Sequence, residues 1–204
     1  MRLIVALQIP EAVRESLAEL SANLKKICPR ARWVPMQNAH VTLKFIGEVS
    51  PQQTKEIREA LNFVTDPVPI LMPTSLRDKV PPLAPFEIVF AGLGFFPDAK
   101  RPRSFWAGVD GGPKLTRLAS AIEDALAPLG IARERRDFHP HITLARLDSS
   151  SEIAALRAAT ANNAATQFGR TKVDKFSLYQ SILKNPAPEY TQLAAYSLST
   201  KQSS

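Results

Sequence analysis

The chain has 204 residues, of which 45% are hydrophobic, enough to bury a core as one domain or as two small lobes that share an interface. Lysine and arginine outnumber aspartate and glutamate by 26 to 19, a formal net charge of +7, which favours an anionic partner such as nucleic acid or an acidic membrane surface. These charges are scattered and form no long basic block, so they support a phosphate chemistry without assigning one.

The first predicted element is a short apolar strand at residues 3–7. Gln8, Pro10 and Glu11 interrupt the apolar run, so it lacks the length of a secretory signal, and no other segment reaches the roughly 18 apolar residues of a membrane helix. The single cysteine, Cys28, excludes an internal disulfide and fits a reducing compartment. We therefore expect a cytoplasmic protein that does not enter a membrane.

A helix is predicted after Pro10, because proline suits the first helical turn and the following apolar residues recur with helical spacing. These residues are Val13, Leu17, Leu20 and Leu24.

The next strand carries the sequence His40-Val-Thr-Leu-Lys-Phe45. Strict alternation along a strand predicts a polar face and a core face. The polar face would hold His40, Thr42 and Lys44, and the core face Val41, Leu43 and Phe45.

Ser50-Pro51 predicts the start of a helix over residues 54–63. Residues 64–85 hold prolines at 67, 69, 73, 81, 82 and 85, and since proline lacks a backbone donor, this stretch is predicted to be an insertion loop. A strand rich in β-branched and aromatic residues is expected at 86–93.

The second half repeats this plan. A strand at 104–109 precedes Pro113 and an amphipathic helix, and His141-Ile-Thr-Leu-Ala-Arg146 follows at the place that His40 holds in the first half. A helix at 152–159 and strands at 173–183 and 190–198 complete it. The order predicts an α+β protein, a single two-lobed domain over residues 1–204 made of two interleaved repeats centred on His40 and His141. Each lobe would be a mainly antiparallel sheet with flanking helices.

If a pseudo-two-fold axis relates the lobes, the polar faces of the two motifs meet across a central cleft, with two imidazoles and two hydroxyls around one small site. Hydrolysis of a phosphodiester needs a base and an acid, and two histidines supply both near neutral pH. The hydroxyls of Thr42 and Thr143 can donate hydrogen bonds to phosphate oxygens. This chemistry requires no metal.

Three alternatives stay open at this point. A single His-Thr pair on a strand is commonly a satisfied interior group, although the doubling of the motif argues against that. His139 and His141, together with His40, have the spacing of a three-histidine zinc site. Arg146 can clamp a phosphate if its strand bends or ends, but strict alternation places it on the opposite face, where a salt bridge is the alternative.

The chain resembles the two-histidine phosphoesterase superfamily, specifically the RNA 2',3'-cyclic phosphodiesterase family, also called 2'-5' RNA ligase. The segments that carry the resemblance are MRLIVALQIPE, RWVPMQNAHVTLKFIGEV, RPRSFWAGV and DFHPHITLARL, with one His-x-Thr motif in the second and one in the fourth. The resemblance extends over nearly the whole chain.

The resemblance implies hydrolysis of a terminal 2',3'-cyclic phosphate to a 2'-phosphomonoester, without metal or cofactor. His40 corresponds to the proton donor, His141 to the proton acceptor, and Thr42, Thr143 and Arg146 to groups that bind the substrate phosphate. Implied partners are RNA ends, tRNA fragments among them, or cyclic nucleotides, bound by a monomer. The reverse reaction would be 2'-5' ligation; a 2'-5' oligonucleotide phosphodiesterase or a non-catalytic RNA-binding protein on the same fold are the alternatives.

Overall fold

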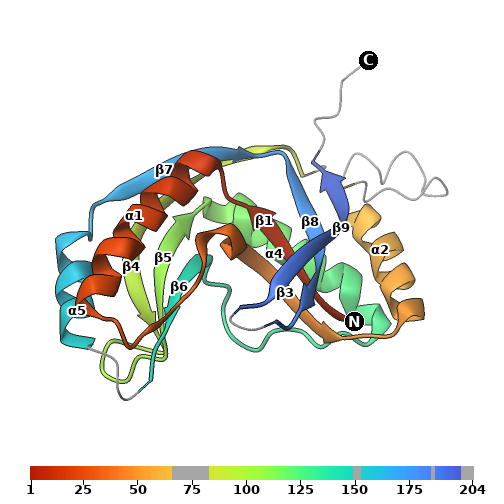
Figure 1. Ribbon diagram of the computed structural model, residues 1–204. Coiled ribbons are helices and arrows are strands. Elements are labelled where there is room, and N and C mark those ends of the chain that lie inside the picture. Colours follow the sequence, from red (N-terminus) through yellow and green to blue (C-terminus); the bar gives the residue numbers. More distant parts are fainter. Residues whose placement is uncertain (66–82, 149–152, 185–186, 199–204) are drawn as a thin grey trace.

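The computed structural model describes residues 1–65, 83–148, 153–184 and 187–198. These residues form two antiparallel sheets with flanking helices (Figure 1), which confirms the α+β class. One sheet has the strand order β3-β1-β8-β9 and the other β2-β6-β5-β4-β7. No helix in the described ranges is long and apolar enough to cross a membrane.

The elements have the following bounds. The four-stranded sheet contains β1 (Arg2–Gln8), β3 (His40–Glu48), β8 (Lys175–Ile182) and β9 (Glu189–Ser197). The five-stranded sheet contains β2 (Arg32–Trp33), β4 (Phe86–Phe96), β5 (Ser104–Asp110), β6 (His141–Arg146) and β7 (Gln167–Val173). The helices are α1 (Glu11–Ile27), α2 (Pro51–Thr65), α4 (Gly112–Leu126) and α5 (Ile153–Asn162), with short 3-10 turns η1 (Met36–Asn38) and η2 (Ala127–Leu129).

The two halves of the chain exchange strands between the sheets. In one sheet β1 pairs with β3 and β8, and in the other β5 pairs with β6 and β4. Strand β4 follows α2 in the first half yet joins the second sheet, whereas β8 comes late in the chain and joins the first. Neither sheet is therefore built from one half alone, and the chain ties the two sheets together.

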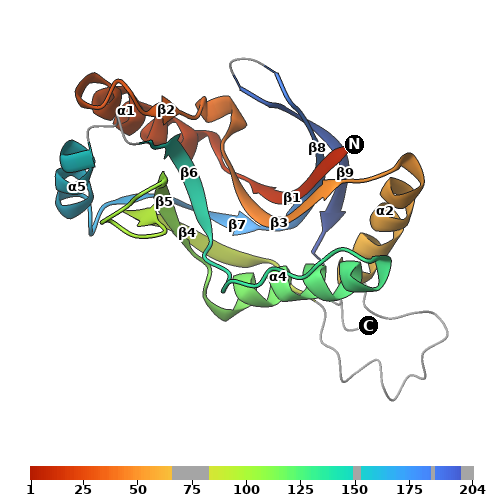
Figure 2. The same ribbon diagram turned by 90° about the horizontal axis from the view of Figure 1, so that it is seen from below.

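The helices cover the outer sides of the sheets (Figures 1 and 2). Helix α1 lies against β7 and α5, while α4 lies against β3 and α2. The apolar stripe predicted after Pro10 is largely buried, since Val13, Leu17 and Leu24 belong to the main core. At the start of α2, the Ser50 hydroxyl accepts from the Gln53 amide N–H while the Gln53 side chain accepts from the Ser50 N–H, a reciprocal cap.

Three parts of the predicted outline differ from the structure. The segment predicted as one strand at 173–183 contains the last residue of β7, Val173, and then β8, which begins at Lys175. Strand β7 was not predicted because its charged residues and Gly169 weaken the β pattern. Strand β2 has two residues, too few to show a period. Residues 66–82 of the predicted insertion loop, and the first residue of the helix predicted at 152–159, lie outside the described residues.

Each histidine-bearing strand has a one-residue β-bulge directly after its threonine. Along β3, Thr42 lies opposite Ala6 and Lys44 lies opposite Val5, so Leu43 has no residue of its own opposite it. Along β6, Thr143 lies opposite Trp106 and Ala145 opposite Phe105, so Leu144 has no residue of its own opposite it. An extra residue reverses the alternation of side chains beyond it.

The bulge overturns the alternation predicted for the end of the first motif. Lys44 is buried, with 5% of its surface exposed, and Phe45 is exposed, at 58%. The polar face therefore carries His40, Thr42 and Phe45 instead of Lys44.

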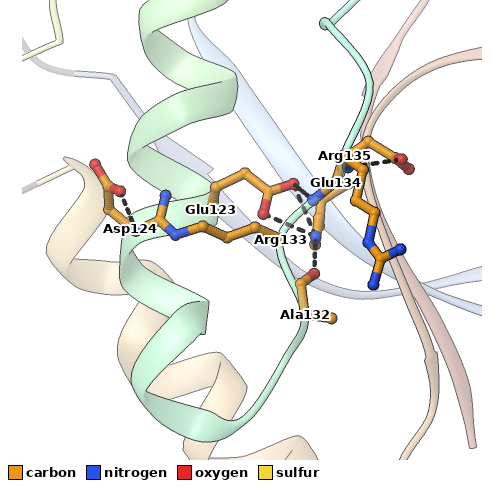
Figure 3. A network of polar contacts seen from close by, with 7 residues as sticks. Glu123, Asp124, Ala132, Arg133, Glu134 and Arg135 are labelled. Carbon is orange, nitrogen blue, oxygen red and sulfur yellow. Dashed lines mark hydrogen bonds and ion pairs between the residues drawn. The ribbon is translucent and has the colours of Figure 1, made fainter.

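The buried ammonium of Lys44 is paired with Glu123 and Ala132, which Figure 3 labels. Its Nζ donates to Glu123 Oε1 at 2.7 Å, to Glu123 Oε2 at 2.8 Å and to the carbonyl oxygen of Ala132 at 2.6 Å. These contacts use all three ammonium donors. They fasten β3 both to α4 and to the segment between η2 and β6, and so connect the strand of His40 with the approach to the strand of His141.

We predict that Glu123→Leu destabilises the fold by about 3 kcal/mol, because it leaves the Lys44 charge buried without its partner. The double variant Lys44→Met with Glu123→Leu should regain most of this loss, since it removes both charges and keeps the volume. Urea unfolding of the three proteins measures both effects. A single variant as stable as the wild type would show that the pair does not hold these elements together.

Candidate active site

The two motif histidines open strands that approach each other where the sheets meet. His40 is the first residue of β3, His141 is the first residue of β6, and these two strands are in contact. Burial lowers the pKa of His40 and the charge of His141 lowers it further, so the two imidazoles lie within electrostatic reach of each other. The structure thus brings together the two motifs from opposite halves of the chain.

Both imidazoles are fixed in the same way by the backbone. His40 Nδ1 lies 2.8 Å from the carbonyl oxygen of Asn38, and His141 Nδ1 lies 2.7 Å from that of His139. Because a carbonyl oxygen only accepts, each Nδ1 carries the hydrogen. In each neutral ring Nε2 therefore carries the lone pair and is free to exchange a proton with a ligand.

Both imidazoles favour the neutral form. Burial is the main cause that lowers the pKa of His40, with a smaller contribution from His141, and the Asn38 carbonyl acts in the opposite direction. Burial also lowers the pKa of His141, the His139 carbonyl raises it, and the charges of Arg146 and His139 lower it further. An anion bound between the rings would offset the surrounding positive charge and favour protonation of one of them.

Thr42 and Thr143 lie on the same faces as the histidines. Each is half-buried and is two residues beyond its histidine, before the bulge. Neither hydroxyl has a hydrogen-bond partner among the described side chains and backbone. Both hydroxyls are therefore available to donate to a ligand.

Arg146 joins His141 and Thr143 on one face because the bulge reverses the alternation that placed it opposite. Its side chain is exposed, it lies opposite Ser104 of β5, and it lowers the pKa of His141. Phe45 holds the equivalent place on β3, opposite Ile4. Sequence reasoning missed Phe45 because it assigned this side chain to the core.

Aromatic rings line both sides of the site. The ring of Tyr190 packs edge-on to His40, with centroids 4.7 Å apart, and the ring of Phe96 packs edge-on to His141 at 4.9 Å. Trp106 lies next to Phe96, at 5.1 Å. These contacts hold the imidazoles in place and give the site apolar walls between its polar groups.

A pocket of about 190 Å³ lies beside His40. Its lining comes from the end of β1, the middle of β8, α1, η1, β9 and the start of β3, and includes Gln8, Arg14, Asn38 and Tyr190. Asn38 also donates to the carbonyl oxygen of Pro188 at 2.8 Å, which joins η1 to the hairpin of β8 and β9. A larger cavity of about 280 Å³, around Ile9 and Lys172, contains none of the residues predicted for the site.

The three-histidine zinc arrangement left open by the sequence does not form. Over the described ranges no three His, Cys, Asp or Glu side chains gather in a way that could hold a metal ion. His139 is exposed, and its backbone carbonyl accepts from His141 Nδ1.

Comparison with known proteins gives one consistent result. Residues 9–184 match the family model described as the 2'-5' RNA ligase superfamily. An RNA 2',3'-cyclic phosphodiesterase of Archaeoglobus fulgidus is 32% identical over 197 residues, 96% of this chain and 99% of that protein. Another, of Aeropyrum pernix, is 34% identical over 182 residues, 89% of this chain and 90% of the relative.

Solved structures share the fold. A protein of Thermus thermophilus superposes with a TM-score of 0.76 at 27% identity, over 97% of this chain and 98% of its own. LigT of Escherichia coli, solved in complex with 3'-AMP, superposes with a TM-score of 0.70 over 98% of each chain. At 23% identity, the likeness to LigT is one of fold.

We predict that both site histidines titrate below the unperturbed value of about 6.5. Arg146→Gln should raise the pKa of His141 more than that of His40, because it removes a positive charge that opposes protonation of His141. Following the imidazole C–H signals by NMR against pH measures both. An unchanged or lower pKa at His141 would mean that Arg146 does not face it.

Proposed function

The chain belongs to the 2'-5' RNA ligase superfamily, and on this premise we propose that it hydrolyses a 2',3'-cyclic phosphate at the end of an RNA to a 2'-phosphomonoester. One observation carries the proposal. Two imidazoles with free Nε2 atoms open two contacting strands from different sheets. The names of the curated relatives, which cover most of this chain, support the same reaction.

We assign the binding of the reacting phosphate to Thr42, Thr143 and Arg146. The two hydroxyls donate to its non-bridging oxygens, one from each sheet. The guanidinium of Arg146 donates to the same phosphate and stabilises the charge that builds as water adds. Each of these donors lies on the face that carries a site histidine.

The chemical step then divides between the imidazoles. Nε2 of His141 takes a proton from water as the water oxygen bonds to phosphorus. The bond between phosphorus and O3' breaks, and His40 donates its Nε2 proton to the departing oxygen. The product has a 2'-phosphate and a 3'-hydroxyl, and exchange with solvent restores both histidines. The anionic substrate favours the protonated form of His40 that this step needs, against the burial that disfavours it.

The reacting group defines the substrate class. RNA ends with a 2',3'-cyclic phosphate, tRNA fragments among them, and cyclic nucleotides all carry it. Exposed Phe45 lies on the face of β3 that carries His40 and Thr42, and a nucleobase can stack on its ring. Since one chain supplies both histidines, we propose that the monomer is active.

We predict that protein treated with EDTA converts an oligoribonucleotide with a 2',3'-cyclic end into a product that carries its phosphate at the 2' position. His40→Ala and His141→Ala should each lower kcat at least about 100-fold, because each removes a proton-transfer group. Gel analysis of the ends, with a phosphatase step to locate the phosphate, measures the outcome. Full turnover by either variant contradicts the proposal, and a 3'-phosphate product would reverse the assigned acid and base.

We predict that Phe45→Leu lowers kcat/KM about tenfold through loss of base stacking, which is worth about 1–3 kcal/mol per base. Phe63→Leu is the matched control, since Phe63 of α2 is also exposed, at 55%, but lies on an outer helix. Steady-state kinetics of the two variants side by side decides the point. Equal effects of the two changes would remove Phe45 from the substrate surface.

A further inference from the structure

A row of four side chains crosses the five-stranded sheet at the far end of β6 from His141. Arg32 of β2 lies opposite Arg146 of β6, Arg146 lies opposite Ser104 of β5, and Ser104 lies opposite Phe96 of β4. Residues directly opposite each other on paired strands share a face. The row, from Arg32 to Phe96, therefore lies on the face that carries His141 and Thr143, and it contains two cations, a hydroxyl and an aromatic ring but no carboxylate.

The two arginines are an unfavourable pair in the protein by itself. Like charges directly opposite on neighbouring strands repel, and arginine stays protonated at all relevant pH values. Both side chains are exposed, and in the described part of the chain neither has an ion-pair or hydrogen-bond partner. Arg133, by contrast, pairs with Asp124 at 2.6 Å. An anion between Arg32 and Arg146 would turn this repulsion into attraction.

Strand β2 holds Arg32 firmly in this place. Its neighbour Trp33 donates from the indole N–H to the carbonyl oxygen of Cys28 at 3.0 Å and packs edge-on to Phe105 in the core. The N–H of Val34 donates to the carbonyl oxygen of Leu144, at the bulge of β6, at 2.8 Å. These contacts fix the backbone that carries Arg32 beside β6.

We infer that Arg32 binds a second phosphate of the substrate, the phosphodiester that joins the last nucleotide of the RNA to the preceding one. Arg32 lies one strand spacing, about 4.8 Å, outward from Arg146, which holds the reacting phosphate. This inference rests on the proposed function and narrows its substrate: oligonucleotide ends are preferred over a cyclic mononucleotide, which has no second phosphate.

The test compares two substrates that end in the same nucleotide: a 2',3'-cyclic mononucleotide and a short oligoribonucleotide with that cyclic end. We expect Arg32→Gln to lower the ratio of their kcat/KM values, oligonucleotide over mononucleotide, at least about tenfold, the loss of one charge-assisted hydrogen bond. Lys55→Gln, which removes one positive charge from exposed α2, is the control for net charge and should leave the ratio as it is. The slope of binding against salt should become shallower in Arg32→Gln alone.

A third substrate identifies the phosphate. This oligonucleotide has a neutral methylphosphonate at its last linkage. The wild type should hydrolyse it with the reduced kcat/KM that Arg32→Gln shows on the normal oligonucleotide. On this substrate, Arg32→Gln should lower kcat/KM no further. The melting temperature of Arg32→Gln should equal or exceed that of the wild type, because the change removes a repulsion. A substrate ratio unchanged by Arg32→Gln, or a loss that persists in full on the methylphosphonate, overturns the inference. Wild-type protein that hydrolyses neither cyclic substrate would instead refute the proposed function.

Discussion

The composition of the site depends on one extra residue in each histidine-bearing strand. Side chains on a strand alternate, so a bulge exchanges the two faces for every residue beyond it. The bulges at Leu43 and Leu144 bring Phe45 and Arg146 onto the faces of His40 and His141. In regular strands both side chains would point into the core, and the site would have neither its arginine nor its exposed aromatic ring.

The bulge on β3 has an unfavourable consequence that other parts of the fold compensate. It turns Lys44 into the interior, where an unpaired ammonium would be strongly unfavourable. Glu123 and the Ala132 carbonyl compensate, and in doing so attach β3 to α4 and to the segment that precedes His141. Because β4 of the first half belongs to the second sheet and β8 of the second half to the first, the chain also connects the two sheets directly. Acid and base groups that come from two sheets must be held at fixed positions relative to each other, because small displacements lower the rate of proton transfer steeply.

The sequence predicted those features that recur with a regular period. Both motif strands, the helices after Pro10 and Pro113, and the shared faces of His40 with Thr42 and of His141 with Thr143 are present in the structure. The bulges could not be predicted, because a period of two assigns a lysine to solvent and a phenylalanine to the core, and the tertiary pairing of Lys44 decided otherwise.

Strand β2 was too short to recognise, so the position of Arg32 beside Arg146 could not be predicted. The placement of Arg146 on the site face came from the family resemblance and contradicts strict alternation. The roles of the individual site residues and the division of the chain into repeats stay predictions.

The central claim is that both imidazoles contact one phosphate. NMR titration of the protein with a nucleoside 2'-monophosphate, the proposed product group, tests it directly through the imidazole signals of His40 and His141. The account predicts that a single equivalent shifts both signals together and raises the pKa of both rings, since each faces the same anion. A shift confined to one ring, or two shifts that saturate at different concentrations, would contradict it.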